Sequence, residues 1–273
     1  MSGRTVRSQV TVPLLRRETI GASYHVLTFD VGKDQGVLPG HFVMVRGAEW
    51  GDAPLLPRPM SYLSGGPTPS ILIKVVGEGT TRMARAEPGE PFSLLGPLGV
   101  PWRAPNPNRR QVLVAGGVGV APLLFLARTL VGARRPIVVY GGRTRSDLPL
   151  DDELAENAEL HVTTEDGSRG HQGRVTDVLG SLLGDDVEVF SCGPDRMMAK
   201  VAELCAKRDV PCEVSVEAPM ACGYGVCLGC PIPATDGGYV YACTQGPCID
   251  ARRIDWSRAD HAPRRSGEGG KTA

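Results

Sequence analysis

The sequence has no net charge, few aromatic residues and no long apolar run. Lys and Arg number 30 and Asp and Glu number 30, so no bulk field draws the chain toward nucleic acid or an anionic membrane. Because no stretch of about 18 apolar residues occurs, no membrane span is expected. The segment Met1–Gln9 is polar and lacks the apolar run of a signal peptide. These absences predict a cytoplasmic protein with neither a nucleic-acid nor a membrane partner.

Glycine, proline and cysteine are, by contrast, plentiful. The 35 glycines and 23 prolines indicate many turns, as short antiparallel strands require. Eight cysteines in a cytoplasmic chain argue against a disulfide framework. Five of them fall between residues 222 and 248, and such bunching indicates a metal site. The length of 273 residues is sufficient for two domains, each with its own core.

The first part of the chain consists of short runs of strand-forming residues separated by Gly, Pro and Asp. About six strands of this kind indicate a small antiparallel barrel or sandwich. The runs are Val6–Leu14, Tyr24–Asp30, His41–Arg46, Met60–Leu63, Ile71–Val76 and Pro91–Leu95.

The pattern changes after Pro101–Asn108, a stretch rich in Pro and Asn that is typical of a linker. Strands then alternate with helices, which predicts a parallel α/β sheet covered on both faces. The predicted strands are Val112–Ala115, Ile137–Tyr140, Leu160–Thr164, Val187–Ser191 and Cys212–Val216. The predicted helices are Pro122–Val131, Asp151–Glu156, Val175–Leu183 and Pro194–Lys207.

Four regions follow from these changes of pattern. We predict a β-barrel domain over residues 1–104 and a nucleotide-binding α/β domain over 105–216. A Gly/Cys-rich segment occupies 217–250, and the polar residues 251–273 are expected to be a disordered tail.

The cysteine-rich segment carries the most specific motif. Cys222, Cys227 and Cys230 have the Cys-x4-Cys-x2-Cys spacing of a plant-type [2Fe–2S] site, and Cys243 provides the distant fourth ligand. Glycines between these cysteines allow backbone N–H groups to approach the cluster sulfides. A tetrahedral zinc site is the alternative, since Cys227 and Cys230 alone would permit it.

A glycine-rich turn lies between the first strand and first helix of the α/β region. It contains Gly116, Gly117 and Gly119, followed by Pro122 in the first turn of the helix. Glycines let backbone amides approach a phosphate, and the helix N-terminus supplies oriented N–H groups. A simple tight connection is the alternative interpretation.

Together these motifs resemble the ferredoxin–NADP reductase superfamily. Arg58-Pro59-Met60-Ser61 is similar to its Arg-Pro-x-Ser signature, and Gly77-Glu-Gly79-Thr80 to its second flavin loop. Gly117-x-Gly119-x-x-Pro122 and Cys192-Gly193-Pro194 resemble its nicotinamide motifs. The segment Glu217–Gly223 resembles the approach to the cluster in the electron-transfer subunits of two-subunit, NAD-dependent dihydroorotate dehydrogenases.

The resemblance implies particular residue roles. Arg58 would pair with the FAD pyrophosphate, Ser61 would lie near flavin N5, and Gly79 and Thr80 would hold phosphates. Further flavin contacts would come from Leu72, Ile73 and Lys74, and nicotinamide contacts from Gly116, Gly117, Gly119, Pro122, Cys192, Gly193 and Pro194. Without the family, a surface ion pair for Arg58 and a strand hydroxyl for Ser61 would be preferred.

Three features depart from the superfamily pattern or leave a choice open. Met60 and Ile73 stand where aromatic residues are common, which makes the expected flavin packing more aliphatic. Arg143 and Arg145 could bind a 2′-phosphate and favour NADP. The acidic loop Thr164–Gly167 resembles that of the NAD-dependent subfamily, so NAD is preferred.

The predicted function is transfer of electrons from a partner's FMN, through a [2Fe–2S] cluster and FAD, to NAD. The resemblance implies an FMN-containing dihydroorotate dehydrogenase catalytic subunit as partner, in a heterotetramer. Two alternatives stay open. One is a related reductase subunit of a sulfide dehydrogenase, sulfite reductase or hydrogenase, and the other is a non-catalytic metal or redox sensor.

Overall fold

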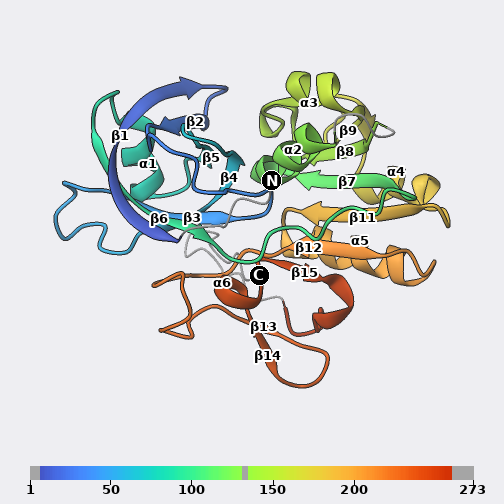
Figure 1. Cartoon of the computed structure of the whole chain (residues 1–273). Helices are drawn as coiled ribbons and strands as arrows, with labels where there is room; N and C mark the ends of the chain where they lie inside the picture. The colour runs from blue at the N-terminus through green and yellow to red at the C-terminus, as the bar shows by residue number, and fades with distance from the viewer. Residues whose placement is uncertain (1–6, 131–134, 260–273) are drawn as a thin grey trace, which may run out of the picture.

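A computed structural model describes residues 7–130 and 135–259 and has the predicted three-part architecture (Figure 1). The first part is a closed antiparallel barrel of six strands in the order β1-β2-β5-β4-β3-β6. Its strands are β1 (Ser8–Thr19), β2 (Tyr24–Phe29), β3 (Phe42–Gly47), β4 (Arg58–Ser64), β5 (Ser70–Lys74) and β6 (Pro91–Leu98), and helix α1 (Glu78–Arg85) follows β5. The predicted strand residue Val6 lies outside the described residues.

Alternation of apolar and polar residues closes the barrel around its own core. Val12 and Leu14 of β1 are buried between exposed neighbours, as a two-residue period requires. Inside, the rings of Phe29 and Phe92 meet edge to face at 5.5 Å between centroids. The pairing register of β1 shifts between Leu14 and Arg16, and such irregularities help strands to bend.

The second part is a seven-stranded sheet in the order β10-β9-β8-β7-β11-β12-β15. Its strands are β7 (Arg110–Gly116), β8 (Ile137–Gly142), β9 (Glu159–Thr164), β10 (His171–Gln172), β11 (Val187–Cys192), β12 (Cys212–Ser215) and β15 (Cys248–Asp250). Its helices are α2 (Val120–Thr129), α3 (Asp151–Asn157), α4 (Val175–Leu182) and α5 (Asp195–Ala206). The end of the first predicted helix, Val131, lies outside the described residues.

The helices cover both faces of this sheet, as predicted. Residues of α2 and α3 pack with Leu113 and Tyr140 on one face, whereas α4 and α5 pack with Val112 and Val114 on the other. Burial on both faces explains why β7 is a continuous apolar run rather than an alternating one. Among the described residues, none of the helices combines the length and apolar character needed to span a bilayer.

The C-terminal segment contributes one strand to the sheet, so the sheet is mixed rather than purely parallel. Strand β15 pairs antiparallel with β12, joining Glu213 to Asp250 and Ser215 to Cys248. A short hairpin, β13 (Pro231–Pro233) and β14 (Tyr239–Tyr241), precedes helix α6 (Ala242–Gln245). Figure 1 shows this segment below both larger domains.

The predicted disordered tail is wrong for residues 251–259. A 3-10 helix covers Ala251–Arg253, and Ala251 and Ile254 are 3% and 2% exposed. Trp256 donates a hydrogen bond from its indole N–H to the carbonyl of Ala251 at 3.0 Å. Scattered apolar residues therefore fix a segment whose composition is largely polar. Residues 260–273 lie outside the described part of the chain.

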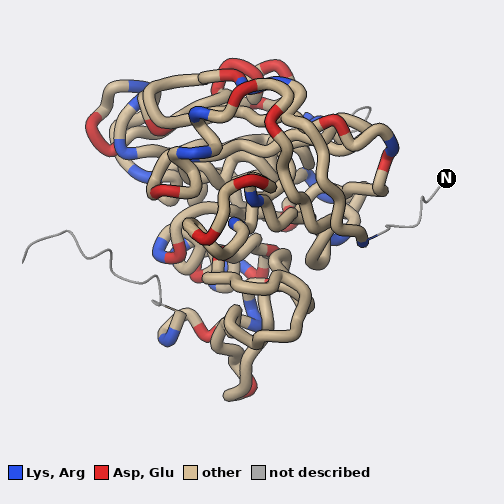
Figure 2. Tube along the Cα trace, turned by 90° about the vertical axis from the view of Figure 1, so that its left-hand side faces the viewer, with Lys and Arg blue, Asp and Glu red and all other residues tan. Residues whose placement is uncertain are grey.

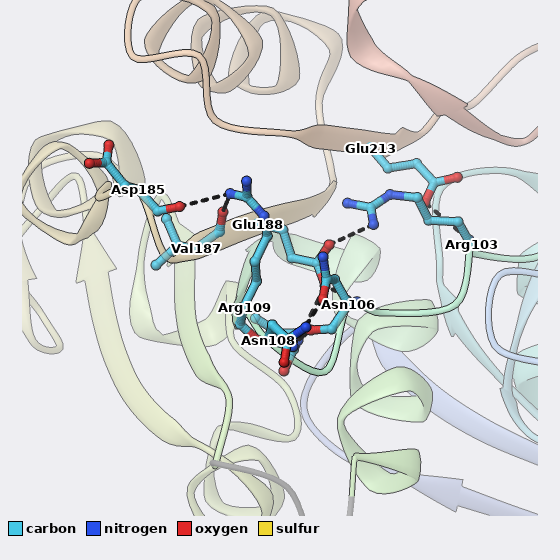
Figure 3. Close-up of polar contacts among 9 residues, drawn as sticks. Arg103, Asn106, Asn108, Arg109, Asp185, Val187, Glu188 and Glu213 are labelled. Atoms are coloured by element: carbon cyan, nitrogen blue, oxygen red, sulfur yellow. Dashed lines mark hydrogen bonds and ion pairs between the residues drawn. The ribbon is translucent and has the colours of Figure 1, made fainter.

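Two buried carboxylates fix the linker between the barrel and the sheet (Figure 3). Glu188 of β11 is fully buried and accepts hydrogen bonds from the Arg103 guanidinium at 2.5 Å and the Asn106 N–H at 2.6 Å. Glu213 of β12 accepts the Arg103 backbone N–H at 3.1 Å. The Arg103 guanidinium also lies 4.9 Å from the centre of the Phe190 ring. The linker thus crosses the sheet along a defined path.

The two acids share a single cation, and this has a consequence for stability. Burial raises the pKa of Glu213 from 4.5 to about 7, with Asp250 and Glu188 adding to the effect and Arg103 opposing it. The folded chain therefore binds a proton at the Glu213 carboxyl group more tightly than the unfolded chain does. Its free energy of unfolding is expected to fall as pH rises from about 4.5 to about 7.

We expect Glu213→Gln to remove this pH-dependent loss, because the amide oxygen can still accept the Arg103 N–H. The melting temperature of the variant minus that of the wild type should increase between pH 4.5 and 7 and then level off. Glu203→Gln is the matched control. Hydrogen bonds from Lys200 and Lys207 lower the pKa of that exposed acid to about 2, so its difference should be constant above pH 5. A flat difference for Glu213→Gln would contradict the assignment.

Candidate functional site

The loop that carries Cys222, Cys227 and Cys230 depends on backbone conformations that favour glycine. Gly223 and Gly225 have φ values of +79° and +94°. A Cβ on Gly223 would lie 2.5 Å from Met44 Cγ, so the loop approaches the barrel closely at this point. A Cβ on Gly225 would lie 2.7 Å from Thr244 Cγ2. The glycines therefore allow both the turn of the loop and its close packing.

The spacing between Cys230 and Cys243 is explained by the β13–β14 hairpin. Pro231 pairs with Tyr241, and the Ala242 N–H donates to the Cys230 carbonyl at 3.0 Å. The Cys243 N–H then points to the Cys230 sulfur at 3.5 Å. Both cysteines are buried, at 2% and 4% exposure, whereas Cys227 is exposed.

Backbone amides surround the sulfurs at the open end of the loop. The Cys227 N–H lies 3.4 Å from the Cys222 sulfur, and the Gly229 N–H lies 3.4 Å from the Cys227 sulfur. Desolvation opposes ionisation of Cys222, yet N–H groups of Cys227, Tyr224 and Val226 lower its pKa to about 6. Thiols arranged among N–H donors and small residues fit an iron–sulfur cluster.

Within the described residues, no group of three His, Cys, Asp or Glu side chains is close enough to hold a single metal ion. The assignment of Cys222, Cys227, Cys230 and Cys243 as ligands stays a prediction.

A cavity of about 900 Å³ lies where the barrel, the sheet and the cysteine-rich segment meet. Ten of the residues predicted to bind cofactors line it: Pro59, Met60, Ser61, Leu72, Lys74, Thr80, Gly119, Cys192, Gly193 and Pro194. A second cavity of about 700 Å³ lies beside α5 and the 3-10 helix Ala251–Arg253, and none of the predicted residues lines it.

Alternation along β5 corrects one residue of the flavin prediction. Leu72 and Lys74 line the cavity, but Ile73, which lies between them, is fully buried in the barrel core. Successive side chains of a strand point to opposite faces, so the Ile73 side chain cannot share the Leu72 surface. The expectation that Ile73 makes flavin packing more aliphatic is therefore wrong for its side chain.

Arg58 is the first residue of β4, and its side chain lies against the first turn of helix α1, a position that suits a pyrophosphate ligand. A Cβ on Gly79 would be only 2.3 Å from Arg58 Nε, so Gly79 leaves the space that this guanidinium occupies. Arg58 also donates to the Leu56 carbonyl. A permanent cation beside oriented N–H groups is suited to a diphosphate.

The hydroxyl of Thr80 shapes this loop. It accepts the N–H groups of Val76 and Gly77 at 2.9 and 3.2 Å and donates to the Gly77 carbonyl at 3.0 Å. Thr80 is 5% exposed. The predicted phosphate contact through this hydroxyl thus competes with three hydrogen bonds inside the protein.

The predicted nicotinamide motifs pack against each other at the carboxyl ends of β7 and β11. Ala115 is the register partner of Cys192, so the two glycine turns that follow lie side by side. A Cβ on Gly119 would lie 2.4 Å from the Cys192 carbonyl oxygen. Gly193 has a φ of +158°, and a Cβ there would lie 3.0 Å from Gly116 Cα. Open α/β sheets bind nucleotides at this kind of crevice.

The loops that could choose between NAD and NADP contact each other. The Arg145 N–H donates to Ser168 Oγ at 2.8 Å, and Ser168 donates to Asp166 from its N–H and hydroxyl at 2.9 and 2.6 Å. The Arg143 side chain is 78% exposed and lies 3.7 Å from Asp147. Cations and acids are thus both available at this end of the crevice.

Several cavity residues were not predicted as site residues. Phe42 comes from the barrel, Arg196 from α5, and Glu217 and Met220 from the strand-to-loop connection. Burial raises the pKa of Glu217, and nearby Asp195 adds to this. The segment Glu217–Met220 was identified only as an approach to the cysteines. Its position directly after a parallel strand was the signal for a cavity role.

These features define a flavin- and nicotinamide-dependent oxidoreductase with an added iron–sulfur segment. Residues 113–203 match a family profile described as an oxidoreductase NAD-binding domain. Residues 217–255 match the iron–sulfur cluster binding domain of dihydroorotate dehydrogenase B.

Curated relatives specify the family. The chain is 34% identical over 229 residues to the dihydroorotate dehydrogenase B (NAD(+)) electron transfer subunit of Desulforamulus reducens, covering 80% of this chain and 87% of the relative. A probable subunit of the same name from Methanopyrus kandleri is 39% identical over 222 residues, covering 80% of each chain. The chain belongs to the family of electron-transfer subunits of NAD-dependent dihydroorotate dehydrogenase B.

Solved structures agree with this placement. A chain of an NADH-dependent reduced ferredoxin–NADP oxidoreductase superposes with a TM-score of 0.80 at 27% identity, covering 95% of this chain and 93% of that one. The ferredoxin reductase of carbazole 1,9a-dioxygenase, at 18% identity and a TM-score of 0.66, covers 75% and 67% and shares the fold. The predicted cofactor set of FAD, an iron–sulfur cluster and NAD is supported by the family and the fold.

We expect Cys227→Ser to lower bound iron and acid-labile sulfide sharply while FAD is retained, because the residues predicted to bind the flavin lie in the barrel domain. Iron, sulfide and flavin would be quantified on the purified variant. Cys205→Ala is the control, since Cys205 is a fully buried residue of α5 and is not one of the four predicted ligands. Full cluster content in Cys227→Ser, or a wild type that binds zinc without sulfide, would refute the ligand assignment.

We expect Arg58→Ala to weaken FAD binding about ten- to a hundred-fold, as loss of a charge-assisted contact predicts. The measurement is FAD retention during dialysis, followed by titration of the apoprotein. Arg82→Ala serves as control, because Arg82 is on the α1 helix that the Arg58 side chain contacts and pairs with Glu78. Equal FAD affinity in both variants would show that Arg58 does not bind the diphosphate.

Proposed function

We propose that this chain conveys electrons between the FMN of a dihydroorotate dehydrogenase catalytic subunit and NAD, with a [2Fe–2S] cluster and FAD as its own cofactors. The observation that carries the proposal is the single cavity to which all three parts contribute. Ser61 of the barrel, Gly193 of the nucleotide crevice and Pro231 next to the cluster cysteine Cys230 line the same space.

The three cofactors divide the chemistry between them. When bound, nicotinamide exchanges two electrons as hydride, an iron–sulfur cluster exchanges one electron at a time, and a flavin does both. The chain supplies position and electrostatics. Arg58 and the α1 N-terminus would hold the flavin diphosphate, and the interlocked glycines would seat the nicotinamide nucleotide.

Burial limits the acid–base chemistry of this site. Desolvation, with a contribution from Glu217, raises the pKa of Cys192 well above its usual value, so its thiol stays protonated at neutral pH. A neutral thiol is a small, uncharged neighbour for a reactant. We assign it a packing role against the nicotinamide rather than a nucleophilic one.

The cysteine loop presents an apolar surface that suits a partner subunit. Tyr224, Val226 and Leu228 are 51%, 72% and 55% exposed. Residues 217–250 contain only three charged side chains, and Figure 2 shows few charges in the corresponding lower part of the molecule. Interface cores are depleted of charge in this way. An electron-transfer loop must also approach its partner closely, which supports docking of the catalytic subunit here.

None of the eight cysteines, all of which lie in the described residues, forms a disulfide, and this supports a reducing, cytoplasmic location for such a complex.

A related reductase subunit that serves another electron carrier is the second candidate. Its support is the similarity to a chain of an NADH-dependent reduced ferredoxin–NADP oxidoreductase, which extends over 95% of this chain. The two functions differ in the partner that contacts the cluster, while the flavin and nicotinamide chemistry is shared.

The test is reconstitution. We expect the purified chain alone to oxidise NADH with ferricyanide but not to oxidise dihydroorotate. Addition of the catalytic subunit encoded in the same genome should produce dihydroorotate-dependent NADH formation. The Cys227→Ser variant should fail to support it. Dihydroorotate oxidation by this chain alone would contradict the proposal, and coupling to a ferredoxin-linked enzyme alone would favour the second candidate.

The docking surface has its own matched pair of variants. Val226→Glu places a charge on the cysteine loop and should weaken the complex at least tenfold, measured by titration of the two subunits. Leu15→Glu introduces the same change at a 48% exposed position of β1 and should leave the affinity unchanged. Equal affinities for both variants would exclude the loop from the interface.

A further inference from the structure

An ion pair connects the barrel to the nucleotide domain beside the shared cavity. Lys74 Nζ, at the end of β5, lies 2.7 Å from Asp147 Oδ1, in the 3-10 helix Arg145–Asp147 that follows β8. The two side chains are 29% and 14% exposed. Lys74 also lines the cavity, so one partner of the pair faces the reactants and the other lies behind it.

A tyrosine from each domain extends this contact. The Tyr24 hydroxyl of β2 donates to the same Asp147 oxygen at 3.4 Å, and the Lys74 ammonium lies 5.0 Å from the centre of the Tyr24 ring. Across the interface, the Tyr140 hydroxyl of β8 lies 3.0 and 3.1 Å from the carbonyl oxygens of Gly117 and Pro149, which share its one proton. Burial keeps both tyrosines protonated by raising their pKa values.

The contact reaches the glycine turn directly. A Cβ on Gly117 would lie 3.8 Å from the Tyr24 hydroxyl, so barrel and glycine turn are in van der Waals range there. Gly117 has a φ of +53°, and its carbonyl is fixed by Tyr140. Asp147, Lys74 and Tyr24 thus couple the barrel strand β5 to the turn that seats the nucleotide.

Both members of the pair are charged at neutral pH. Desolvation disfavours each charged form. Hydrogen bonding and attraction between the two groups nevertheless raise the pKa of Lys74 and lower that of Asp147. Arg143, 3.7 Å from the second Asp147 oxygen, supports the same charge state from the solvent side. A partly buried ion pair of this kind is less screened than one on an open surface.

We propose that Asp147 is a positioning residue that, through Lys74 and Tyr24, holds the nucleotide domain against the barrel and so sets how the nicotinamide approaches the flavin. The inference rests on the proposed NAD-linked activity. Asp147 itself does not line the cavity, so its effect is on orientation. A small misplacement of reactants is costly because hydride transfer requires close alignment.

The test uses the FAD-loaded chain with NADH and ferricyanide, in which each NADH gives up two electrons and one proton and reduces two ferricyanide ions. Asp147→Asn removes the charge and keeps the shape. We expect kcat to fall about three- to tenfold while KM for NADH changes less than twofold. The rate of flavin bleaching by NADH under anaerobic conditions should fall by the same factor. FAD content should be unchanged.

The exchanged pair Lys74→Asp with Asp147→Lys separates positioning from general damage. If the attraction across the interface is what matters, the double variant should recover most of the bleaching rate lost in either single variant. Glu203→Gln, which removes an exposed carboxylate paired within α5, is the control and should match the wild type.

A wild-type rate in Asp147→Asn would overturn the inference and leave the proposed function intact. A second outcome would also overturn the inference: Asp147→Asn bleaches slowly, but the double variant Lys74→Asp with Asp147→Lys, with normal FAD content, bleaches no faster. A wild-type chain that binds FAD yet fails to oxidise NADH would overturn the proposed function and the inference together.

Discussion

The arrangement of the three parts depends on one buried carboxylate, that of Glu188. It lies on an inner strand of the sheet and accepts two of its hydrogen bonds from the linker, through Arg103 and the Asn106 N–H. Gln111 of β7 adds a third hydrogen bond at 3.2 Å. A buried charge without partners is strongly unfavourable, so the linker must return to this position each time the chain folds. The barrel is thereby delivered to a fixed place beside the sheet.

The position of the cavity follows from the linker that Glu188 holds. With the linker held on β11 and β12, strands β4 and β5 face the crevice between β7 and β11. The cysteine-rich segment closes the third side. Its loop packs on Met44 of the barrel, and its last strand pairs with β12. Each part alone offers only a portion of a binding surface. The space that could bring hydride and one-electron chemistry together exists only between them.

Much of this could be predicted from the sequence. Strands with strong alternation or continuous apolar runs, such as Tyr24–Phe29 and Val187–Cys192, were predicted to within two residues, because local pattern determines them. Helix α1 was missed because its sequence, with Gly79 and two threonines, has weak helix propensity and depends on its position against the barrel. Strand β15 was missed because three residues carry little local signal, and its pairing with β12 is a long-range event.

The candidate site shows the same difference between features set by local sequence and features set by long-range contacts. The cysteine spacing and the glycine turns specify chemistry locally, and both were recognised. The direction of individual side chains required the strand register, which explains the error at Ile73. The cavity role of Glu217 and the contact between Lys74 and Asp147 were not predicted. The position of Glu217 directly after a predicted strand was a local signal. The contact between Lys74 and Asp147 depends on how separate domains meet, and no window of sequence contains that information.

Strand β15 also bears on how such a protein could evolve. A cluster module joined only by a linker could be exchanged between proteins as an independent cassette. Here the segment supplies the outermost strand of the nucleotide sheet, pairing Cys248–Asp250 with β12. Its removal would leave β12 as an exposed edge, which is a template for aggregation. Recombination that separates the cluster segment from the nucleotide domain would therefore lower the solubility of the protein. The cluster segment and the nucleotide domain are expected to be inherited as one unit.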